Sequence, residues 1–302
     1  FAVERAGLYS TIQDGGRIGH RALGVPPSGA MDPLALWAAN AAAGNPPDAP
    51  ALELTAPGPV LRALDDLTVA VAGADLSAAV DGSPVEPATP LRVRRGQRLA
   101  FGAPRAGVWA YIAVAGGVEG HRALGSAATF APGLLGGSGG RRLREGDIVG
   151  RGDLPGRPPR LLRPPALPAS SIAVRVILGP QDEWLTEEAR AAFLKEEYRT
   201  SRHGDRAGLR LDGPRLAHRE ARAFLSDGVL PGAVQVPPDG APIVLLADGP
   251  TTGGYPKIAV VIAADLRLLA QARPGTAVRF RAVAMEEAVD AWRALIGARE
   301  GG

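Results

Sequence analysis

Glycine and proline recur along the whole of this chain of 302 residues. It contains 40 glycines and 28 prolines, and neither residue is confined to one segment. Both residues interrupt regular structure and mark turns. Turns at such short intervals leave room for short strands and few helices. The pattern therefore predicts a mainly β fold with a few short helices.

A cluster of prolines between residues 150 and 171 divides the chain. Its members are Pro155, Pro158, Pro159, Pro164, Pro165 and Pro168. Because proline has a fixed φ and no N–H group, this segment cannot be a central strand or a helix. We interpret residues 156–171 as an extended linker. It would join an N-terminal β domain, residues 1–155, to a C-terminal β domain, residues 172–302.

Short apolar or β-branched runs bounded by glycine, proline or aspartate predict the strands. The clearest runs are residues 67–72, 91–93, 97–101, 108–115 and 173–178. A glycine turn followed by a closing strand occurs three times, at residues 95–101, 144–149 and 274–280. This weak repeat favours two related β-barrels in tandem, although glycine turns are common in any β protein.

Three helices are predicted. The first has Asp32 as its N-cap, Pro33 at the first helical position and Gly44 as a left-handed stop. The second covers residues 186–197 and begins at a capping threonine. The last ends before Gly297 and carries one apolar stripe, made of Met285, Ala288, Val289, Trp292, Leu295 and Ile296.

Composition excludes several classes of function. Without cysteine the chain has no disulfide and no catalytic thiolate. The four histidines lack the spacing of metal ligands, so we expect no metal site. The net charge is only +3, with no lysine-rich run, so nucleic-acid binding is not expected. No apolar stretch is long enough to span a membrane and no signal peptide is evident, so we expect a cytoplasmic protein.

The decapeptide from Asp248 to Lys257 carries the strongest functional signal. Apolar runs at residues 243–247 and 258–264 precede and follow it, so we expect two buried strands joined by a tight loop. Glycine allows a ligand to approach the backbone closely, and polar loops on rigid strands often carry function. The candidate site residues between the two ends are Thr251, Thr252, Gly253, Gly254 and Tyr255.

Lys257 is unusual because arginine supplies nearly every other cation of the chain. Lysine and arginine together number 34, and Lys195 is the only other lysine. A lysine at this place favours a compact point charge that a planar guanidinium would not replace. The alternative interpretation is a surface lysine whose stem lies along apolar neighbours.

A second polar constellation lies near the N-terminus, in residues 10–17 and 24–33. Asp14 precedes two glycines, so it either forms a turn with its own backbone or has a functional role. Asp32 is most simply the cap of the first helix. Ser28 is a candidate anion ligand, helped by the nearby helix N-terminus. Arg17 adds a cation to the same segment.

These strings resemble the biotin-dependent carboxyltransferase-like family, which includes the C subunit of 5-oxoprolinase, the KipA protein and the second allophanate-hydrolase-type domain of urea carboxylase. The resemblance covers nearly the whole chain. It rests on residues 11–14 with 16–17, and on residues 24–32, 125–147, 227–240 and 251–257. Two of the family strings depart from the expected pattern here, at residues 205–209 and 248–250.

The resemblance implies two tandem cyclophilin-like β-barrel modules. It also implies a subunit of an ATP-dependent 5-oxoprolinase, which opens the lactam of 5-oxo-L-proline to L-glutamate. The partner would be related to allophanate hydrolase subunit 1, that is, the B subunit of 5-oxoprolinase, with an A subunit as a further partner. The alternatives are a carboxyltransferase component acting on urea or a related amide with carboxybiotin, and a KipA-type regulatory protein that antagonises a kinase inhibitor.

Lactam opening and carboxyl transfer to urea both need hydrogen-bond donors at a carbonyl oxygen and a base near the nitrogen or the water. On the family strings we assign catalytic roles to Lys257, Asp14 and Asp248. The expected substrate-binding residues are Arg17, Ser28, Thr251, Thr252, Gly253, Gly254, Tyr255 and Arg206. No P-loop string is present, so ATP would bind on a partner or be shared with it. Neither lysine has the sequence context of a biotin carrier, so no covalent biotin is expected on this chain.

Overall fold

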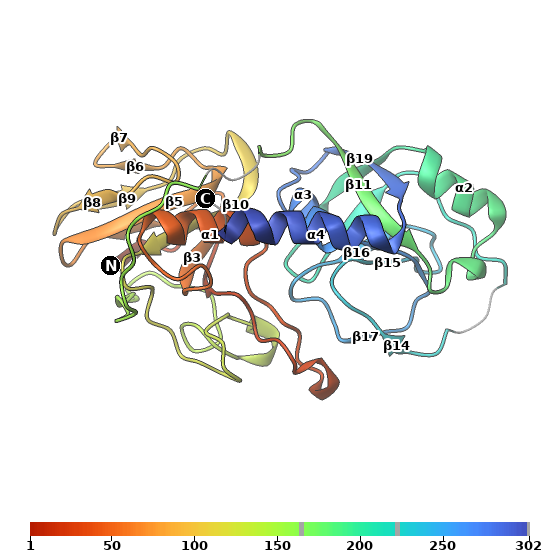
Figure 1. Ribbon diagram of the computed structural model, residues 1–302, viewed down its shortest axis with the longest axis horizontal. Helices are drawn as coiled ribbons and strands as arrows, with labels where there is room; N and C mark the ends of the chain where they lie inside the picture. The colour runs from red at the N-terminus through yellow and green to blue at the C-terminus, as the bar shows by residue number, and fades with distance from the viewer. Residues whose placement is uncertain (163–165, 221–223, 301–302) are drawn as a thin grey trace. The chain divides into compact units, whose positions relative to one another are not determined.

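The computed structural model describes residues 1–162, 166–220 and 224–300 (Figure 1). The described chain forms two compact units. Residues 1–18 and 27–167 belong to the first, and residues 19–26 and 168–300 belong to the second. The inclusion of residues 19–26 in the second unit is not indicated by any sequence pattern, because it depends on contacts far along the chain.

Two five-stranded antiparallel sheets make up most of the first unit. One has the order β1-β4-β9-β6-β7, with the bounds Ala2–Arg5, Val60–Arg62, Arg98–Ala100, Ala79–Val80 and Ser83–Pro84. The other has the order β2-β3-β10-β5-β8, with the bounds Tyr9–Gln13, Ala51–Thr55, Ala106–Val114, Leu67–Asp75 and Leu91–Val93. Their apolar side chains form one core that includes Leu54, Leu61, Val69, Leu99 and Ile112.

Helix α1, Pro33–Ala42, packs on β5 and β10 of the second sheet. Its start follows the sequence signals: the Asp32 carboxylate accepts a hydrogen bond from the Ala35 N–H at 3.2 Å, and proline occupies the first turn. Gly44 lies just beyond the helix with φ +73°, a conformation that glycine adopts without a Cβ penalty. The predicted first helix is therefore confirmed.

The second unit contains a closed seven-stranded barrel, in the order β11-β18-β15-β16-β13-β12-β19. The bounds in that order are Ser171–Leu178, Lys257–Val261, Ala233–Gln235, Ile243–Leu245, Gly208–Asp212, Tyr198–Gly204 and Ala277–Ala282. The pair β11 and β19 is parallel, and the others are antiparallel. Valine, isoleucine and aromatic side chains fill the interior, and the rings of Phe193 and Phe280 stack with centroids 4.5 Å apart.

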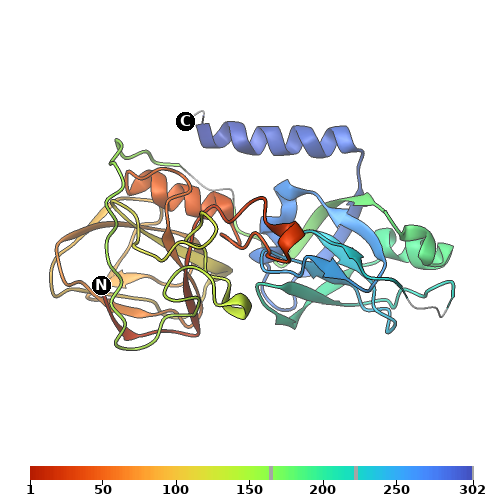
Figure 2. The same cartoon turned by 90° about the horizontal axis from the view of Figure 1, so that it is seen from below.

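Short helices accompany the strands. In the second unit they are α2 (Glu187–Lys195), α3 (Leu266–Ala270), α4 (Met285–Glu300), η1 (Arg21–Leu23), η3 (Asp182–Trp184) and η4 (Ala263–Asp265), and the first unit adds η2 (Ala131–Gly133). The Thr186 side chain caps α2, as predicted. Figure 2 shows α4 leaving the barrel after β19 and running outside it.

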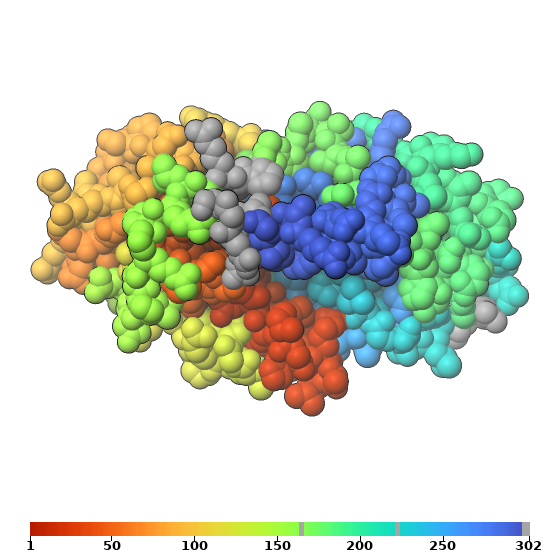
Figure 3. All heavy atoms as spheres, viewed as in Figure 1, coloured from red at the N-terminus to blue at the C-terminus, as the bar shows by residue number. Residues whose placement is uncertain are grey.

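Helix α4 differs from the sequence prediction in two respects. It continues through Gly297 to Glu300, because a single glycine lowers helix stability without ending the helix. Its apolar stripe is only partly covered, with Met285 58% and Trp292 41% exposed, and Figure 3 shows the helix at the surface of the molecule.

The mainly β fold with few short helices is confirmed, and the predicted strands are present. The part of the predicted linker that includes Pro164 and Pro165 lies outside the described residues. Before it, the N–H groups of Arg157 and Arg160 donate to the carbonyls of Gly44 and Ala41 at the end of α1. Among the described residues, no helix combines the length and the apolar character that crossing a bilayer requires.

Candidate functional site

The loop of residues 246–256 connects β16 to β18, but these strands are not neighbours. Strand β15 lies between them in the barrel, so the loop crosses over β15 rather than forming the tight connection expected from the sequence. Part of the loop, β17 (Thr252–Gly253), pairs with β14 (Asp227–Gly228) as a two-stranded ribbon. The Val229 N–H also donates to the Thr251 carbonyl at 3.0 Å. The predicted site residues thus lie on a ribbon that a distant segment stabilises.

Lys257 is buried and anchors this ribbon. Its ammonium donates to the Asp227 carboxylate at 2.6 Å and to the Gly228 carbonyl at 2.9 Å. These bonds engage two of the three donors of an ammonium group. The hydrogen bond from Lys257 holds the pKa of Asp227 below its usual value, and the Gly228 N–H adds to the effect. The oxyanion role of Lys257 stays a prediction that depends on its third donor.

Gln181, which the sequence analysis missed, also stabilises the contact between Lys257 and Asp227. Its side-chain carbonyl accepts the Lys257 backbone N–H, and its amide donates to the Asp227 carboxylate, both at 3.2 Å. The side-chain carbonyl and the amide of a glutamine can act together in this way. No local pattern marks Gln181, because its partners lie 46 and 76 positions further along the chain.

Arg206 and Asp248 form a buried ion pair in the second unit. The guanidinium donates to both carboxylate oxygens, at 2.7 Å and 3.0 Å, and the two side chains are only 4% and 6% exposed. The Asp248 N–H also donates to the Arg206 carbonyl at 2.8 Å. The structure thus brings two predicted site residues together. Both oxygens of the carboxylate are engaged by the bidentate guanidinium, so this geometry favours a structural role over that of a base.

Asp14 and Arg17 lie in the first unit, where they fasten residues 123–128 to the end of β2. The Asp14 carboxylate accepts from the Gly16 N–H at 2.8 Å, and from the Ser126 hydroxyl and the Ala127 N–H at 2.6 Å each. Arg17 is 1% exposed and donates to the carbonyls of Ala123 and Ala128. These contacts favour the structural interpretation of Asp14, and the catalytic and binding roles stay predictions.

Ser28 adopts an unusual backbone conformation in the same unit. Its φ is +53°, a left-handed value that non-glycine residues rarely adopt. It is 8% exposed, and its hydroxyl has no hydrogen-bond partner among the described residues. Strained backbone of this kind often accompanies functional sites.

Glu53, which the sequence analysis also missed, supports the segment that contains Ser28. Its carboxylate accepts from the Tyr111 hydroxyl at 2.7 Å and from the Met31 N–H at 2.8 Å. The Tyr111 oxygen accepts from the Asp32 N–H at 2.8 Å. Burial, and then the charge of Glu53, raise the pKa of Tyr111 well above its usual value. A glutamate within the apolar strand of residues 51–55 was the signal available in the sequence.

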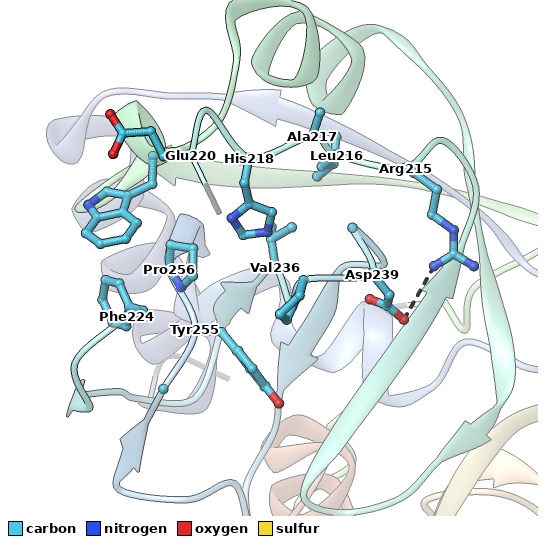
Figure 4. Close-up of a pocket in the computed structure, with 14 residues that line it drawn as sticks. Arg215, Leu216, Ala217, His218, Glu220, Phe224, Val236, Asp239, Tyr255 and Pro256 are labelled. Atoms are coloured by element: carbon cyan, nitrogen blue, oxygen red, sulfur yellow. Dashed lines mark ion pairs between the residues drawn. The ribbon is translucent and has the colours of Figure 1, made fainter. Parts of the chain in front are cut away.

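An aromatic pocket of about 680 Å3 lies in the second unit beside Gly254 and Tyr255 (Figure 4). Trp184 and Phe224 line it and meet edge to face, with ring centroids 4.9 Å apart. Glu220 and Asp239 bring acidic groups to the pocket. A pocket with this lining suits a flat molecule that stacks on aromatic rings.

His218 also lines the aromatic pocket, and a backbone contact fixes its ring. Its Nε2 lies 3.0 Å from the Pro237 carbonyl oxygen, which accepts a hydrogen bond when Nε2 carries the proton. Across the pocket, Asp239 pairs with Arg215 at 3.7 Å, which Figure 4 marks with a dashed line.

A second depression, of about 430 Å3, has a different character. We call it the arginine pocket, because Arg202 and Arg210 line it. It lies on the hairpin of β12 and β13, with Ile243, Leu245 and Pro250 contributing apolar surface. Pro250 belongs to the same loop that reaches the aromatic pocket through Gly254. Metal binding is not indicated, since the described residues contain no cluster of three or more histidines, aspartates or glutamates suited to it.

Comparison with known proteins gives consistent results. Residues 23–282 match the carboxyltransferase domain family, subdomains A and B. The chain is 38% identical to the C subunit of 5-oxoprolinase from Escherichia coli, over 95% of this chain and 92% of that protein. It is 33% identical to urea amidolyase of Lachancea kluyveri, over 93% of this chain but only 17% of the relative.

A solved structure agrees with this result. The crystal structure of the urea amidolyase of K. lactis superposes with a TM-score of 0.94 at 28% identity, over 99% of this chain and 20% of that one. The resemblance seen in the sequence strings is therefore confirmed: the chain belongs to the carboxyltransferase domain family, subdomains A and B.

Proposed function

We propose that this chain is the C subunit of an ATP-dependent 5-oxoprolinase, which opens the lactam of 5-oxo-L-proline to L-glutamate. One observation carries the proposal: the chain corresponds almost from end to end to a relative named as the C subunit of 5-oxoprolinase, with 92% of that relative covered. The urea amidolyases correspond to this chain over less than a fifth of their length.

A lactam carbonyl is a weak electrophile, so the reaction needs activation before water can attack. ATP, as a co-substrate, would supply it by transferring its γ-phosphoryl group to the lactam oxygen, which releases ADP. Water would then add to the activated carbon, and the C–N bond would break as the nitrogen takes a proton. A second water would release phosphate from the resulting acyl phosphate. The part of this chain would be to bind and orient the lactam and to donate hydrogen bonds to its oxygen. We assign the donor role to the third N–H of Lys257 and to the backbone of Gly253 and Gly254. No base role is assigned to Asp14 or Asp248, because their oxygens already accept hydrogen bonds.

Partner chains are part of the proposal. We infer that ATP binds on a protein related to allophanate hydrolase subunit 1, the B subunit of the enzyme, or is shared with it, and that an A subunit completes the assembly. The name of the relative, which designates it a C subunit, supports an assembly of several chains. The absence of a P-loop string in this sequence supports a nucleotide site shared with another chain.

A second candidate is a carboxyltransferase component that acts on urea or a related amide with carboxybiotin. The TM-score of 0.94 with the urea amidolyase structure favours it as an alternative. Such a component would work together with a biotin carrier and a biotin carboxylase.

The test is reconstitution. This chain is mixed with its partner chains, ATP and 5-oxo-L-proline, and glutamate is measured over time, with parallel mixtures that lack ATP or lack this chain. We expect glutamate only in the complete mixture. A folded, complete complex that forms no glutamate would exclude the proposal, and bicarbonate- and urea-dependent ATP hydrolysis with a biotin carrier would favour the alternative.

A further inference from the structure

The arginine pocket has an excess of positive charge that the described part of the protein does not neutralise. Arg202 and Arg210 are both exposed, and neither guanidinium group has a hydrogen-bond or ion-pair partner among the described residues. Arg199, on the same strand as Arg202, pairs instead with Glu197 at 2.8 Å. The contrast singles out the two guanidinium groups of the pocket.

The acidic residue of this pocket, Asp205, offsets only one of the two positive charges. One oxygen of Asp205 accepts the backbone N–H groups of Ala207 and Gly208, at 2.8 Å and 3.2 Å. The carboxylate therefore serves the turn between β12 and β13, as aspartates commonly do. His203 adds an imidazole to the lining.

A third guanidinium, that of Arg21, lies at the edge of the pocket. Its Nη2 donates to the Val229 carbonyl and, at 3.4 Å, to the carbonyl of Pro250, a residue that lines the pocket. Val229 belongs to the same small apolar cluster as Leu245. The other terminal nitrogen of Arg21, Nη1, is buried without a hydrogen-bond partner among the described residues. A buried donor without a partner is costly, and a bound acceptor would remove that cost.

Burial disfavours the charged form of Arg21. Desolvation lowers the pKa of its guanidinium from the usual value, because the charged form loses contact with water. An anion at this place would reverse the effect by favouring the charged form.

We propose that Arg21, Arg202 and Arg210 form a carboxylate-binding site, and that it holds the carboxylate of the substrate. The identity of that substrate rests on the proposed function. The planar, forked guanidinium matches a carboxylate with two parallel hydrogen bonds. Ile243 and Leu245 offer apolar surface to the methylene groups of a lactam ring.

This site gives a physical reason to separate the two candidate substrates. 5-Oxoproline carries a carboxylate that is ionised at neutral pH, whereas urea is uncharged. The aromatic pocket offers an anion less, since its only arginine among the described residues, Arg215, is paired with Asp239 and Glu220 adds a further acidic group. We therefore assign anionic amides and lactams as the substrate class, with the arginine pocket as the source of the selectivity.

The test is a calorimetric titration of the assembled complex with two ligands that differ in one group. 5-Oxo-L-proline has the carboxylate, and 2-pyrrolidinone is the same ring without it. We expect 2-pyrrolidinone to bind at least about tenfold more weakly, since a hydrogen bond to a charged group contributes about that factor or more. Similar affinities for the two ligands would overturn the proposal.

Single-site variants locate the effect. Arg210→Gln and Arg202→Gln, which alter exposed side chains, should each weaken 5-oxo-L-proline binding about tenfold. Arg199→Gln removes the same charge from the same strand outside the pocket, and should leave the affinity within about twofold. Equal affinities of all three variants for 5-oxo-L-proline would contradict the assignment. Displacement of 5-oxo-L-proline by inorganic tripolyphosphate would also contradict it, because it would identify a phosphate site instead.

Binding and glutamate formation, measured together, distinguish a failure of the carboxylate site from a failure of the proposed function. Charge-dependent binding that Arg210→Gln weakens, without any glutamate formation, would contradict the proposed reaction and leave the carboxylate site standing. Glutamate formation with unchanged binding and an unchanged KM in Arg210→Gln would contradict the carboxylate site alone.

Discussion

Replacement of Asp248 by asparagine would leave the charge of Arg206 buried and without its carboxylate. The two side chains are 4% and 6% exposed, and they share hydrogen bonds of 2.7 Å and 3.0 Å. Asparagine keeps nearly the same volume, so the change removes a charge without creating a large cavity. The loss should therefore appear mainly as an electrostatic cost.

The size of this cost follows from two estimates that agree. Coulomb's law for unit charges about 4 Å apart, at an effective dielectric constant of about 20, gives about 4 kcal/mol. Measured removal of one partner from a buried pair costs about 3–5 kcal/mol. We expect Asp248→Asn to lower the free energy of unfolding by that amount, and the melting temperature by on the order of 10 °C.

Urea unfolding followed by circular dichroism measures the effect, with two comparisons. Asp66→Asn breaks an ion pair with Arg92 in which the two side chains are 49% and 72% exposed, so it should have a much smaller effect on stability. The double variant Arg206→Met with Asp248→Leu removes both buried charges and should recover most of the stability. The reasoning is refuted if Asp248→Asn costs no more than Asp66→Asn, or if the double variant is less stable than Asp248→Asn.

Three further results are expected. Lys257→Met should lower kcat/KM of the reconstituted complex about a hundredfold, the usual effect of removing one oxyanion donor. A change within about twofold would contradict the oxyanion role and show that Lys257 only anchors the ribbon. The hydrogen bond from Lys257 depresses the pKa of Asp227 below its ordinary value of 3.8. The ion pair therefore stabilises the fold above that pH, and its contribution is lost as pH falls through the depressed pKa. The difference in unfolding free energy between wild type and Asp227→Asn should be present at pH 7 and shrink below about pH 4, and a difference that grew on acidification would contradict this sign. Gly136→Ala should destabilise the first unit by at least about 1 kcal/mol, because φ is +71° and a Cβ would collide with the Ala128 carbonyl. Gly139→Ala is the matched control, because φ is a similar +65° and the space around it is open; it should lower the melting temperature less than Gly136→Ala does.

The features that the sequence predicts well depend on neighbours within a few positions. Asp32, Pro33 and Gly44 mark α1 because caps and stops act within one turn of a helix. Thr186 marks α2 for the same reason. The β class follows from turn residues, which also act locally.

The site was less predictable because its contacts are distant along the chain. Arg21 donates to a carbonyl 208 positions away, and no periodicity or motif encodes that contact. The loop of residues 246–256 was expected to be tight, since nothing local indicates that β15 lies between β16 and β18. Lys257 stood out by residue type, but the bond of its ammonium to Asp227, 30 positions away, is visible only in three dimensions.

The charged groups of these sites fall into two kinds, those paired within the fold and those that have no partner in the part of the chain that the structure describes. Asp14, Asp248 and Lys257 each hold segments of the protein together, whereas Arg202 and Arg210 have no such partner among the described residues. The central claim is that the substrate's carboxylate binds where this positive charge is left uncompensated. Groups already paired within the fold have less capacity to bind it.

A crystal structure of the assembled complex with 5-oxo-L-proline tests this claim most directly. We predict that the ligand's carboxylate lies in the arginine pocket, about 3 Å from the guanidinium nitrogens of Arg210 and of Arg21. A carboxylate found in the aromatic pocket beside Tyr255, or against Lys257, would contradict it.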